Sequence, residues 1–218
     1  MSHTLGIRQA QKQKTRQALL DAALGLLEHQ SLSSMGLREV TRAVGVAPAA
    51  FYRHFKDTAD LGVALVEEAL GSLHETIRAA IVTTGGSEER IDRAVDLIAT
   101  HVRAHPAHVR FIARERHGGV APVRAAIGVQ LRRFADEVAE ALGADPESQG
   151  WSAADLRMLA GVYVDHMVMT ASAILEAGAG ADPDGGDEEA ARRAEEAVLA
   201  TARRQLRLVT LGRRHWLD

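Results

Sequence analysis

The segment Leu37–Asp57, LREVTRAVGVAPAAFYRHFKD, constrains the fold most, because it predicts two short helices joined by a tight turn. In its first half, Val40 and Val44 stand four residues apart on one helical face. Gly45 falls where the first helix must end, since glycine accepts the left-handed backbone of a helix C-terminus. Pro48 suits the first turn of a second helix, where its missing N–H needs no partner. The segment therefore predicts a helix-turn-helix.

The second of these helices is expected to bury one face and expose the other. Phe51 and Phe55 lie four residues apart and share the inner face. The residues left to point outward are Tyr52, Arg53, His54 and Lys56. A short exposed helix followed by side chains that bind phosphate is typical of a protein that binds the major groove of DNA.

Charge is distributed unevenly along the chain, as DNA binding requires. Residues 1–56 carry eight Lys and Arg against three Asp and Glu, so their net charge is +5. The whole chain has a net charge of −3, which leaves −8 for the remainder and argues against a general nucleic-acid binder. A basic head on an acidic body favours a protein that presents one face to DNA.

Three blocks of sequence resemble the TetR family of transcriptional regulators: the segment GIRQAQKQKTR (Gly6 to Arg16), the helix-turn-helix segment, and RERHGG (Arg114 to Gly119). Within that family the resemblance is closest to the FabR/DesT-type repressors of unsaturated fatty-acid synthesis. It implies a three-helix DNA-binding domain over residues 1–56. Residues 57–218 would then form a ligand-binding and dimerisation domain, giving an all-α protein of about nine helices.

Phosphate contacts are expected to supply most of the affinity for DNA, because the charge of the backbone dominates binding. The side chains expected to make them carry positive charge or donate hydrogen bonds, and two of them, Tyr52 and His54, match phosphate contacts in the family. The set is Lys12, Lys14, Arg16, Tyr52, His54 and Lys56.

Base contacts are expected to supply the specificity. The front of the second helix offers only small apolar groups, which can contact thymine methyls. These residues are Ala47, Pro48, Ala49 and Ala50. Arg42 and Arg53 are long enough to reach a guanine edge, although surface arginines equally serve as phosphate clamps.

Three positions depart from the family pattern. Gly36 and Ala47 stand where hydroxyl residues usually cap the two helices, and Thr58 stands where many members have lysine. A lost side-chain cap costs about 0.5–2 kcal/mol for alanine and less for glycine. Backbone N–H groups at the start of the second helix are expected to hold phosphate instead.

The rest of the chain also predicts helices, because proline is rare and the alternation expected of strands is absent. A flexible arm is expected over residues 1–11 and a flexible segment over 177–187. Helices are expected over 12–29, from 57 or 58 to 84, and over 87–105, 107–116, about 120–143, 153–177 and 188–213.

Several classes of protein are disfavoured by composition. The chain has no cysteine, which excludes disulfides and zinc–thiolate sites. The polar, basic N-terminus predicts no secretory signal. The apolar run Met158–Leu175 contains Asp165 and His166, which favours a buried helix over a membrane span. We therefore expect a cytoplasmic protein with no membrane partner.

The resemblance implies a cavity in the body that holds a long apolar effector, which for this branch is acyl-CoA. No resident cofactor or metal is expected. In RERHGG, an arginine would either meet an anionic headgroup or tie its helix to the head. Asp165 and His166 need partners, either across a dimer or in the pocket. The residues expected to bind the ligand are Phe111, Arg114, Arg116, Val120, Val123, Leu131, Tyr163, His166, Met167 and Thr170.

No known catalytic motif occurs in the chain, so no enzymatic activity is expected. His101, His105 and His108 have a spacing that could hold a metal on one helical face. Pro106 interrupts that helix, however, and no acidic or thiol ligand is nearby. The three histidines are therefore interpreted as exposed polar residues near a helix end.

Together these features predict a ligand-responsive repressor of fatty-acid and lipid genes. It would dimerise through its last two helices and bind a palindromic operator, with its heads about 34–36 Å apart. Two alternatives stay open. One is a TetR-type regulator of an efflux or catabolic operon that senses another small hydrophobic molecule. The other is a helical small-molecule carrier or enzyme with no DNA role.

Overall fold

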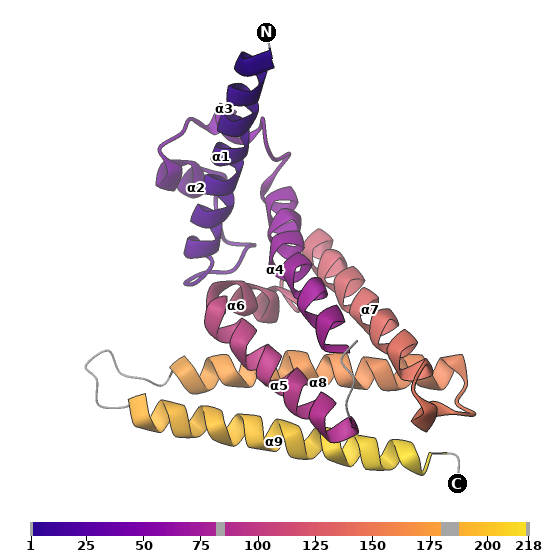
Figure 1. Cartoon of the computed structure of the whole chain (residues 1–218). Coiled ribbons are helices and arrows are strands. Elements are labelled where there is room, and N and C mark those ends of the chain that lie inside the picture. Colours follow the sequence, from indigo (N-terminus) through magenta and orange to yellow (C-terminus); the bar gives the residue numbers. More distant parts are fainter. Residues whose placement is uncertain (1, 82–85, 180–187, 217–218) are drawn as a thin grey trace. The chain divides into compact units, whose positions relative to one another are not determined.

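The computed structural model describes residues 2–81, 86–179 and 188–216, and these residues contain nine α-helices, one 3-10 turn and no strand. The all-α prediction is confirmed. The elements are α1 (Ser2–Leu26), α2 (Leu37–Val44), α3 (Pro48–Phe51), α4 (Thr58–Ile81), α5 (Ser87–Ala104), α6 (Pro106–Glu115), α7 (Ala121–Gly143), η1 (Pro146–Ser148), α8 (Ala153–Ala179) and α9 (Glu188–Arg214) (Figure 1).

The helix-turn-helix forms as the sequence predicts. Gly45 ends α2 with a φ of 74°, in the left-handed region that favours glycine, and its N–H donates to the Arg42 carbonyl. The N–H of Val46 donates to the carbonyl of Thr41 at 3.0 Å, which closes the turn. Pro48 occupies the first turn of α3, which is only four residues long.

The cap that Gly36 cannot make is partly replaced by Glu39. The N–H of Gly36 donates to Glu39 Oε2 at 2.9 Å, and the N–H of Glu39 donates to the Gly36 carbonyl at 3.0 Å. This is the carboxylate half of a capping box. Ala47, at the start of α3, makes no side-chain cap, as expected from its methyl group.

Side-chain caps also form at the start of two other helices. At the start of α4, Asp57 Oδ1 accepts from the N–H of Asp60 at 2.8 Å. At the start of α8, the N–H of Asp155 donates to Ser152 Oγ at 3.1 Å, and the hydroxyl donates to the Asp155 carboxylate at 2.6 Å. Each contact satisfies backbone or side-chain groups that a helix end leaves without a partner.

The prediction of a flexible arm over residues 1–11 is wrong. Helix α1 begins at Ser2 and runs unbroken to Leu26, so residues 2–10 form its first turns. The segment has no proline, and its Gln, Lys, Arg and Ala residues are good helix formers, which outweighs the cost of about 1 kcal/mol for Gly6. The arm is therefore a continuation of the first head helix.

The chain divides into two compact units whose segments alternate along the sequence. Unit 1 comprises Met1–Ala69 and Arg110–Ile127, and unit 2 comprises Leu70–Val109 and Gly128–Asp218. Unit 1 therefore contains the head helices together with the end of α6 and the start of α7. The domain boundary between residues 56 and 57 stays a prediction, because compactness does not measure independent folding.

The core of unit 1 is built from apolar side chains of the head, α4 and α7. The buried set includes Leu19, Ala23, Leu27, Val40, Phe51, Phe55, Leu61, Leu65, Val123 and Ile127. At its centre the backbone of Gly62 packs so closely that a Cβ there would lie 2.5 Å from Leu32 and 2.8 Å from Val123. Any larger residue at position 62 would push these elements apart.

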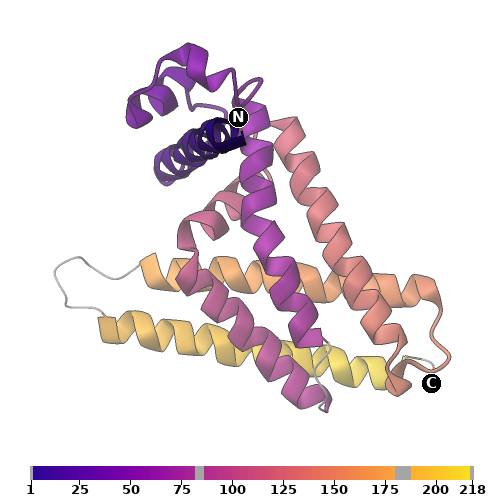
Figure 2. The same cartoon turned by 45° about the horizontal axis from the view of Figure 1, so that its top comes forward.

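The core of unit 2 is formed by α5, α8 and α9. Helices α8 and α9 run side by side in opposite directions, and α5 packs against both of them (Figures 1 and 2). Its buried residues include Ile91, Val95, Ile98, Ala99, Val102, Ile174, Leu199, Ala202 and Leu206.

Two predicted boundaries lie outside the described residues: the end of α4 near Thr84, and most of the flexible segment over 177–187. Helix α8 has the length and apolarity to cross a membrane, with a mean hydropathy of 1.4 in an 18-residue window within Ala153–Gly178. Core helices of soluble proteins share these properties. Only 22% of the apolar window is buried within the chain, so the predicted burial of α8 is not achieved by one chain alone.

Candidate nucleic-acid interface

The exposed side of α3 and the turn after it carries the predicted DNA-contact residues. Phe51 and Phe55 are buried beneath it with ring centroids 5.5 Å apart, and they anchor the turn. Tyr52 is 63% exposed above them. The other exposed members of the predicted set are Arg42, Ala47, Pro48, Ala49, Arg53 and Lys56, and Ala50 is half-buried.

His54 does not point freely outward as predicted. It is half-buried beside α1, and its Nδ1 is buried without a hydrogen-bond partner among the described residues. The backbone explains this difference, because α3 ends at Phe51 and the turn after it no longer follows helical spacing. His54 therefore lies against α1, whereas Tyr52 is exposed.

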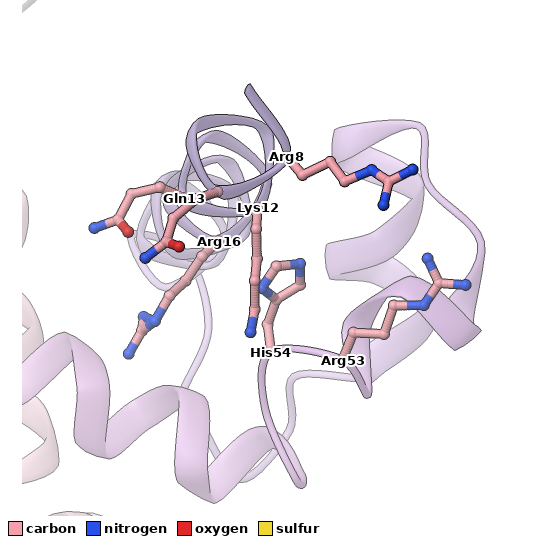
Figure 3. A pocket seen from close by; sticks show the side chains of 7 residues that line it. Arg8, Lys12, Gln13, Arg16, Arg53 and His54 are labelled. Carbon is pink, nitrogen blue, oxygen red and sulfur yellow. The ribbon is translucent and has the colours of Figure 1, made fainter. Parts of the chain in front are cut away.

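His54 helps to line a basic groove between α1 and the turn after α3 (Figure 3). The groove encloses about 520 Å³. Its lining residues are Arg8, Gln9, Lys12, Gln13, Arg16, Arg53 and His54. None of them is acidic, so every charged residue of the lining is positive. Arg8, Gln9 and Gln13 were absent from the predicted contact set. Their spacing along α1 would have revealed them if the arm had been recognised as helical.

The basic residues of α1 separate into two groups. Arg8, Lys12 and Arg16 follow one another at intervals of four residues and share the face of the groove. The Arg16 guanidinium lies over the Phe55 ring, 4.7 Å from its centroid, which holds the charge in place. Lys14 is exposed and does not line the groove.

Electrostatics in the groove disfavour a charged histidine. Burial, followed by the positive charges of Lys12, Arg16 and Arg53, lowers the pKa of His54 below its usual value of 6.5. In the free chain the imidazole is therefore neutral at pH 7, and the charge of the groove comes from the lysine and arginine side chains.

The predicted ligand residues are divided between the two units. Phe111, Arg114, Arg116, Val120 and Val123 belong to unit 1, and Leu131, Tyr163, His166, Met167 and Thr170 belong to unit 2. Phe111, Val123 and Thr170 are buried, and Met167 packs against the core of unit 2. Their assignment to a ligand site stays a prediction.

In unit 1, the arginine and glutamate of the RERHGG motif contact the end of α1. Arg114 Nη1 donates to the carbonyls of Leu27 and Gln30, each at 2.7 Å. The N–H of Leu32 donates to Glu115 Oε1 at 2.9 Å, and the Glu115 side chain is buried. Gly118 packs against the Glu115 carboxylate so closely that a Cβ would clash. The motif therefore binds α6 to the segment between α1 and α2.

In unit 2, several polar groups lie inside the helical packing. The Tyr163 and Thr210 hydroxyls are 3.3 Å apart, and Thr170 donates to the His166 carbonyl at 2.9 Å. His166 Nε2 is buried without a hydrogen-bond partner in the part of the chain that the structure describes. Asp165 is exposed on a single chain.

A polar contact that the sequence did not reveal joins α4 to α7. His74 is buried, with Nε2 2.9 Å from Gln130 Oε1 and Nδ1 3.3 Å from Glu137 Oε2. Its ring stacks on Phe134 at 3.8 Å. These residues lie 56 or more positions from His74, so no local spacing could indicate the contact.

The histidines at the α5–α6 corner form a stacked group. The rings of His101 and His105 are 5.1 Å apart, and those of His105 and His108 are 5.8 Å apart. His101 and His108 are half-buried, so the prediction that all three are exposed is wrong for these two. Burial and the neighbouring His105 and His108 lower the pKa of His101. Among the described residues, no group of His, Cys, Asp and Glu has the geometry of a metal site.

Residues 19–65, which run from the last two turns of α1 to the start of α4, match the family model "Bacterial regulatory proteins, tetR family". The helix-turn-helix segment of this chain matches the TetR family. The matched segment contains the helix-turn-helix and the aromatic turn of the head. The predicted closeness to FabR/DesT-type repressors within the TetR family stays a prediction.

Solved structures share the fold of this chain. FadR from Bacillus subtilis in complex with stearoyl-CoA is 15% identical, with a TM-score of 0.67, and the match covers 88% of this chain and 96% of that one. AibR in complex with isovaleryl coenzyme A and operator DNA is 16% identical, with a TM-score of 0.61, covering 85% and 96%. A TetR-family regulator from Syntrophomonas wolfei is 14% identical, with a TM-score of 0.68, covering 89% and 95%. At these identities the likeness shows the fold alone.

Proposed function

We propose that this chain is a transcriptional repressor that binds a palindromic DNA operator as a homodimer and responds to long-chain acyl-CoA. The main observation behind the proposal is the set of exposed side chains on the DNA-binding head. The turn after its short α3 exposes Tyr52, Arg53 and Lys56 above a buried aromatic anchor, beside a groove with no acidic lining residue. Such a surface suits the phosphates that flank a major groove.

Dimer formation is supported by apolar side chains that one chain leaves uncovered. On α8, Met169 is 69% exposed and Val162 is 43% exposed, and on α9, Leu208 is 70% exposed. These two helices already pack side by side, so a second copy of the same pair can bury their outer faces as a four-helix bundle. Asp165, also exposed on α8, would then meet the partner subunit.

A route by which a ligand acts on the head is supported by α6. This helix starts in unit 2 at Pro106 and ends in unit 1 at Glu115. Its last residues, Arg114 and Glu115, make hydrogen bonds to four backbone groups between Leu27 and Leu32. A ligand that shifts α6 would therefore shift the end of α1 directly, in addition to any movement along α4.

The choice of acyl-CoA as effector rests on fold and composition. Two structures with this fold were solved with acyl-CoA molecules, stearoyl-CoA in FadR and isovaleryl coenzyme A in AibR. The chain is also poor in aromatic residues, at 4%, which suits a slot for an alkyl chain better than a platform for a planar ligand.

The proposal is tested by fluorescence anisotropy with a duplex from the promoter that flanks the gene. We expect binding that weakens steeply with salt. Stearoyl-CoA and oleoyl-CoA should change the affinity about 5- to 150-fold, the range of typical coupling energies, whereas CoA alone should not. Binding that ignores every acyl-CoA would favour a regulator that senses another hydrophobic molecule. Negligible, salt-insensitive binding to every duplex would instead favour a carrier or enzyme.

A further inference from the structure

Glu115, the last residue of α6, is a buried acid whose hydrogen bonding is incomplete. It is 1% exposed, and its Oε1 accepts from the N–H of Leu32 at 2.9 Å. Its Oε2 is also buried, and no residue that the structure describes donates a hydrogen bond to it. The neighbouring Arg114 donates instead to the carbonyls of Leu27 and Gln30. A buried carboxylate with one hydrogen bond recovers little of the hydration that it loses, so this position of Glu115 is costly.

Gly118 leaves the space that the carboxylate occupies. A Cβ at residue 118 would overlap Glu115 Oε2 and lie 3.1 Å from the Glu115 Cα. Backbone conformation does not require glycine here, because Gly45 and Gly150 are the described residues with positive φ. The RERHGG motif therefore combines a buried carboxylate with the small residue that makes room for it.

Leu32 connects the carboxylate to two other elements of unit 1. Its N–H bonds to Glu115, and it belongs to the segment between α1 and α2. Its buried side chain packs on α4, where a Cβ at Gly62 would lie 2.5 Å from it. Leu32 cannot move without sliding against the backbone of α4. A displacement of Glu115 would therefore act on the entry to the helix-turn-helix and on α4 through one residue.

We propose that Glu115 makes the contact between α6 and the head switchable. In one state, that of this structure, the carboxylate is buried on the N–H of Leu32. In the other, the end of α6 has moved, this hydrogen bond is broken and the carboxylate is hydrated. Hydration of the charge offsets the lost contacts, so the two states are close in free energy and an effector that binds one of them better selects it. The inference rests on the proposed ligand-responsive function and deepens it.

The charge of Glu115 distinguishes a switch from a contact that serves stability alone. Glutamine has nearly the same size and shape, and it keeps an oxygen for the N–H of Leu32. It buries no charge, so it loses the hydration that favours the second state. Glu115→Gln should therefore hold the chain in the buried state, and Glu115 is a positioning residue whose ionisation matters as much as its hydrogen bond.

Hydrogen exchange of the free protein tests the two states without ligand or DNA. The Leu32 amide, compared with the amides of the α4 core in the same protein, should exchange about fivefold or more slowly in Glu115→Gln than in the wild type. Gly118→Ala should have the opposite effect, because its methyl group displaces the carboxylate and frees the Leu32 amide. Glu67→Gln changes an exposed glutamate on α4 in the same unit and should match the wild type.

Anisotropy with the flanking promoter duplex then tests regulation. The effect of stearoyl-CoA on operator affinity should shrink about fivefold or more in Glu115→Gln and persist in Glu67→Gln. Urea denaturation of Glu115→Gln should have a midpoint at least as high as that of the wild type, which separates a lost switch from a damaged fold.

Two results would overturn the inference while the proposed function stands. One is an amide of Leu32 that exchanges equally in the wild type, Glu115→Gln and Gly118→Ala. The other is a full response to stearoyl-CoA in Glu115→Gln. If the wild type itself binds no duplex, or ignores every acyl-CoA, the proposed function fails, and the exchange of the Leu32 amide still decides whether Glu115 has two states.

Discussion

At the scale of single residues, the head separates side chains that hold its shape from side chains that are free to contact DNA. Phe51 and Phe55 are fully buried, and their neighbour Tyr52 is exposed. The interval of four residues between Phe51 and Phe55 predicted this division. The position of His54 was not, because it depends on an irregular turn and on α1, which lies about 40 residues earlier in the chain. Arg8 was missed for a related reason, since its role appears only once α1 is extended to Ser2.

Lys12→Ala should weaken binding to all DNA sequences alike. Lys12 lines the groove from α1 and offers a point charge, which recognises phosphate but no base. The plot of log K against log salt should become shallower by about 1 per head. Arg93→Ala removes an exposed charge from α5 and should leave the slope unchanged. A change of base preference in Lys12→Ala, measured by binding to a set of mutated operators, would contradict this role.

His101 should make the chain less stable in mild acid. Its pKa is lowered in the folded state, by burial and then by His105 and His108. As pH falls below about 6.5, the unfolded chain takes up a proton that the folded chain resists, so the free energy of unfolding decreases. In urea titrations at pH 7.5 and pH 5.5, His101→Gln should lose less stability than the wild type. An identical loss in both proteins would show that His101 is not responsible.

At the scale of helices, the sequence predicted what local signals determine. Gly45 and Pro48 indicated the turn between α2 and α3, and Ser152 indicated the start of α8; the structure has both. Contacts between distant segments could not be predicted in this way. The RERHGG motif suggested two roles for an arginine, and only the fold shows Arg114 on carbonyls 84 and 87 residues earlier in the chain. The buried pairing of His74 with Gln130 and Glu137 left no sequence signal at all.

Arg114→Ala should separate ligand binding from DNA binding. The side chain donates two charge-assisted hydrogen bonds to the end of α1, so its loss should uncouple α6 from the head. Calorimetry with stearoyl-CoA should give unchanged affinity for the free protein, while the effect of ligand on operator affinity shrinks severalfold. A drop in ligand affinity with intact coupling would instead identify Arg114 as a contact for the anionic headgroup. Arg93→Ala serves as the control.

Glu115→Ala should destabilise the chain more than Glu115→Gln. The glutamine keeps an oxygen for the N–H of Leu32, whereas alanine leaves that buried donor unpaired. An unpaired buried group costs about 1–3 kcal/mol, which urea denaturation resolves. Equal stability of the two variants would show that the hydrogen bond to Leu32 contributes little.

At the scale of the whole molecule, the distribution of charge and the exposed apolar side chains both support the proposed dimer with two DNA-binding heads. Residues 1–56 are basic and the remainder is acidic, so only the head should be drawn to DNA. The exposed apolar side chains on α8 and α9, including Met169 and Leu208, support the proposed dimer. Pairing of these helices between two copies would bury them and present two heads to one duplex.

Met169→Glu combined with Leu208→Glu should give a folded monomer with weak operator binding. The two carboxylates would be buried in the proposed interface, which disfavours association. A single head loses the gain from bivalent contact, so the affinity should fall at least about 100-fold. Val129→Glu alters an exposed apolar residue on α7 and should leave the dimer intact. Light scattering after size exclusion gives the oligomeric state, and a double variant that stays dimeric would place the interface elsewhere.

Sedimentation velocity of the chain with a fluorescent, symmetrical duplex from its own promoter tests the central claim most directly. The mass of the complex reports how many chains bind one duplex. We predict two chains per duplex, formed from a dimer that exists before DNA is added. A complex with one chain, or a duplex that sediments as if the protein were absent, would contradict the proposal that paired heads read DNA.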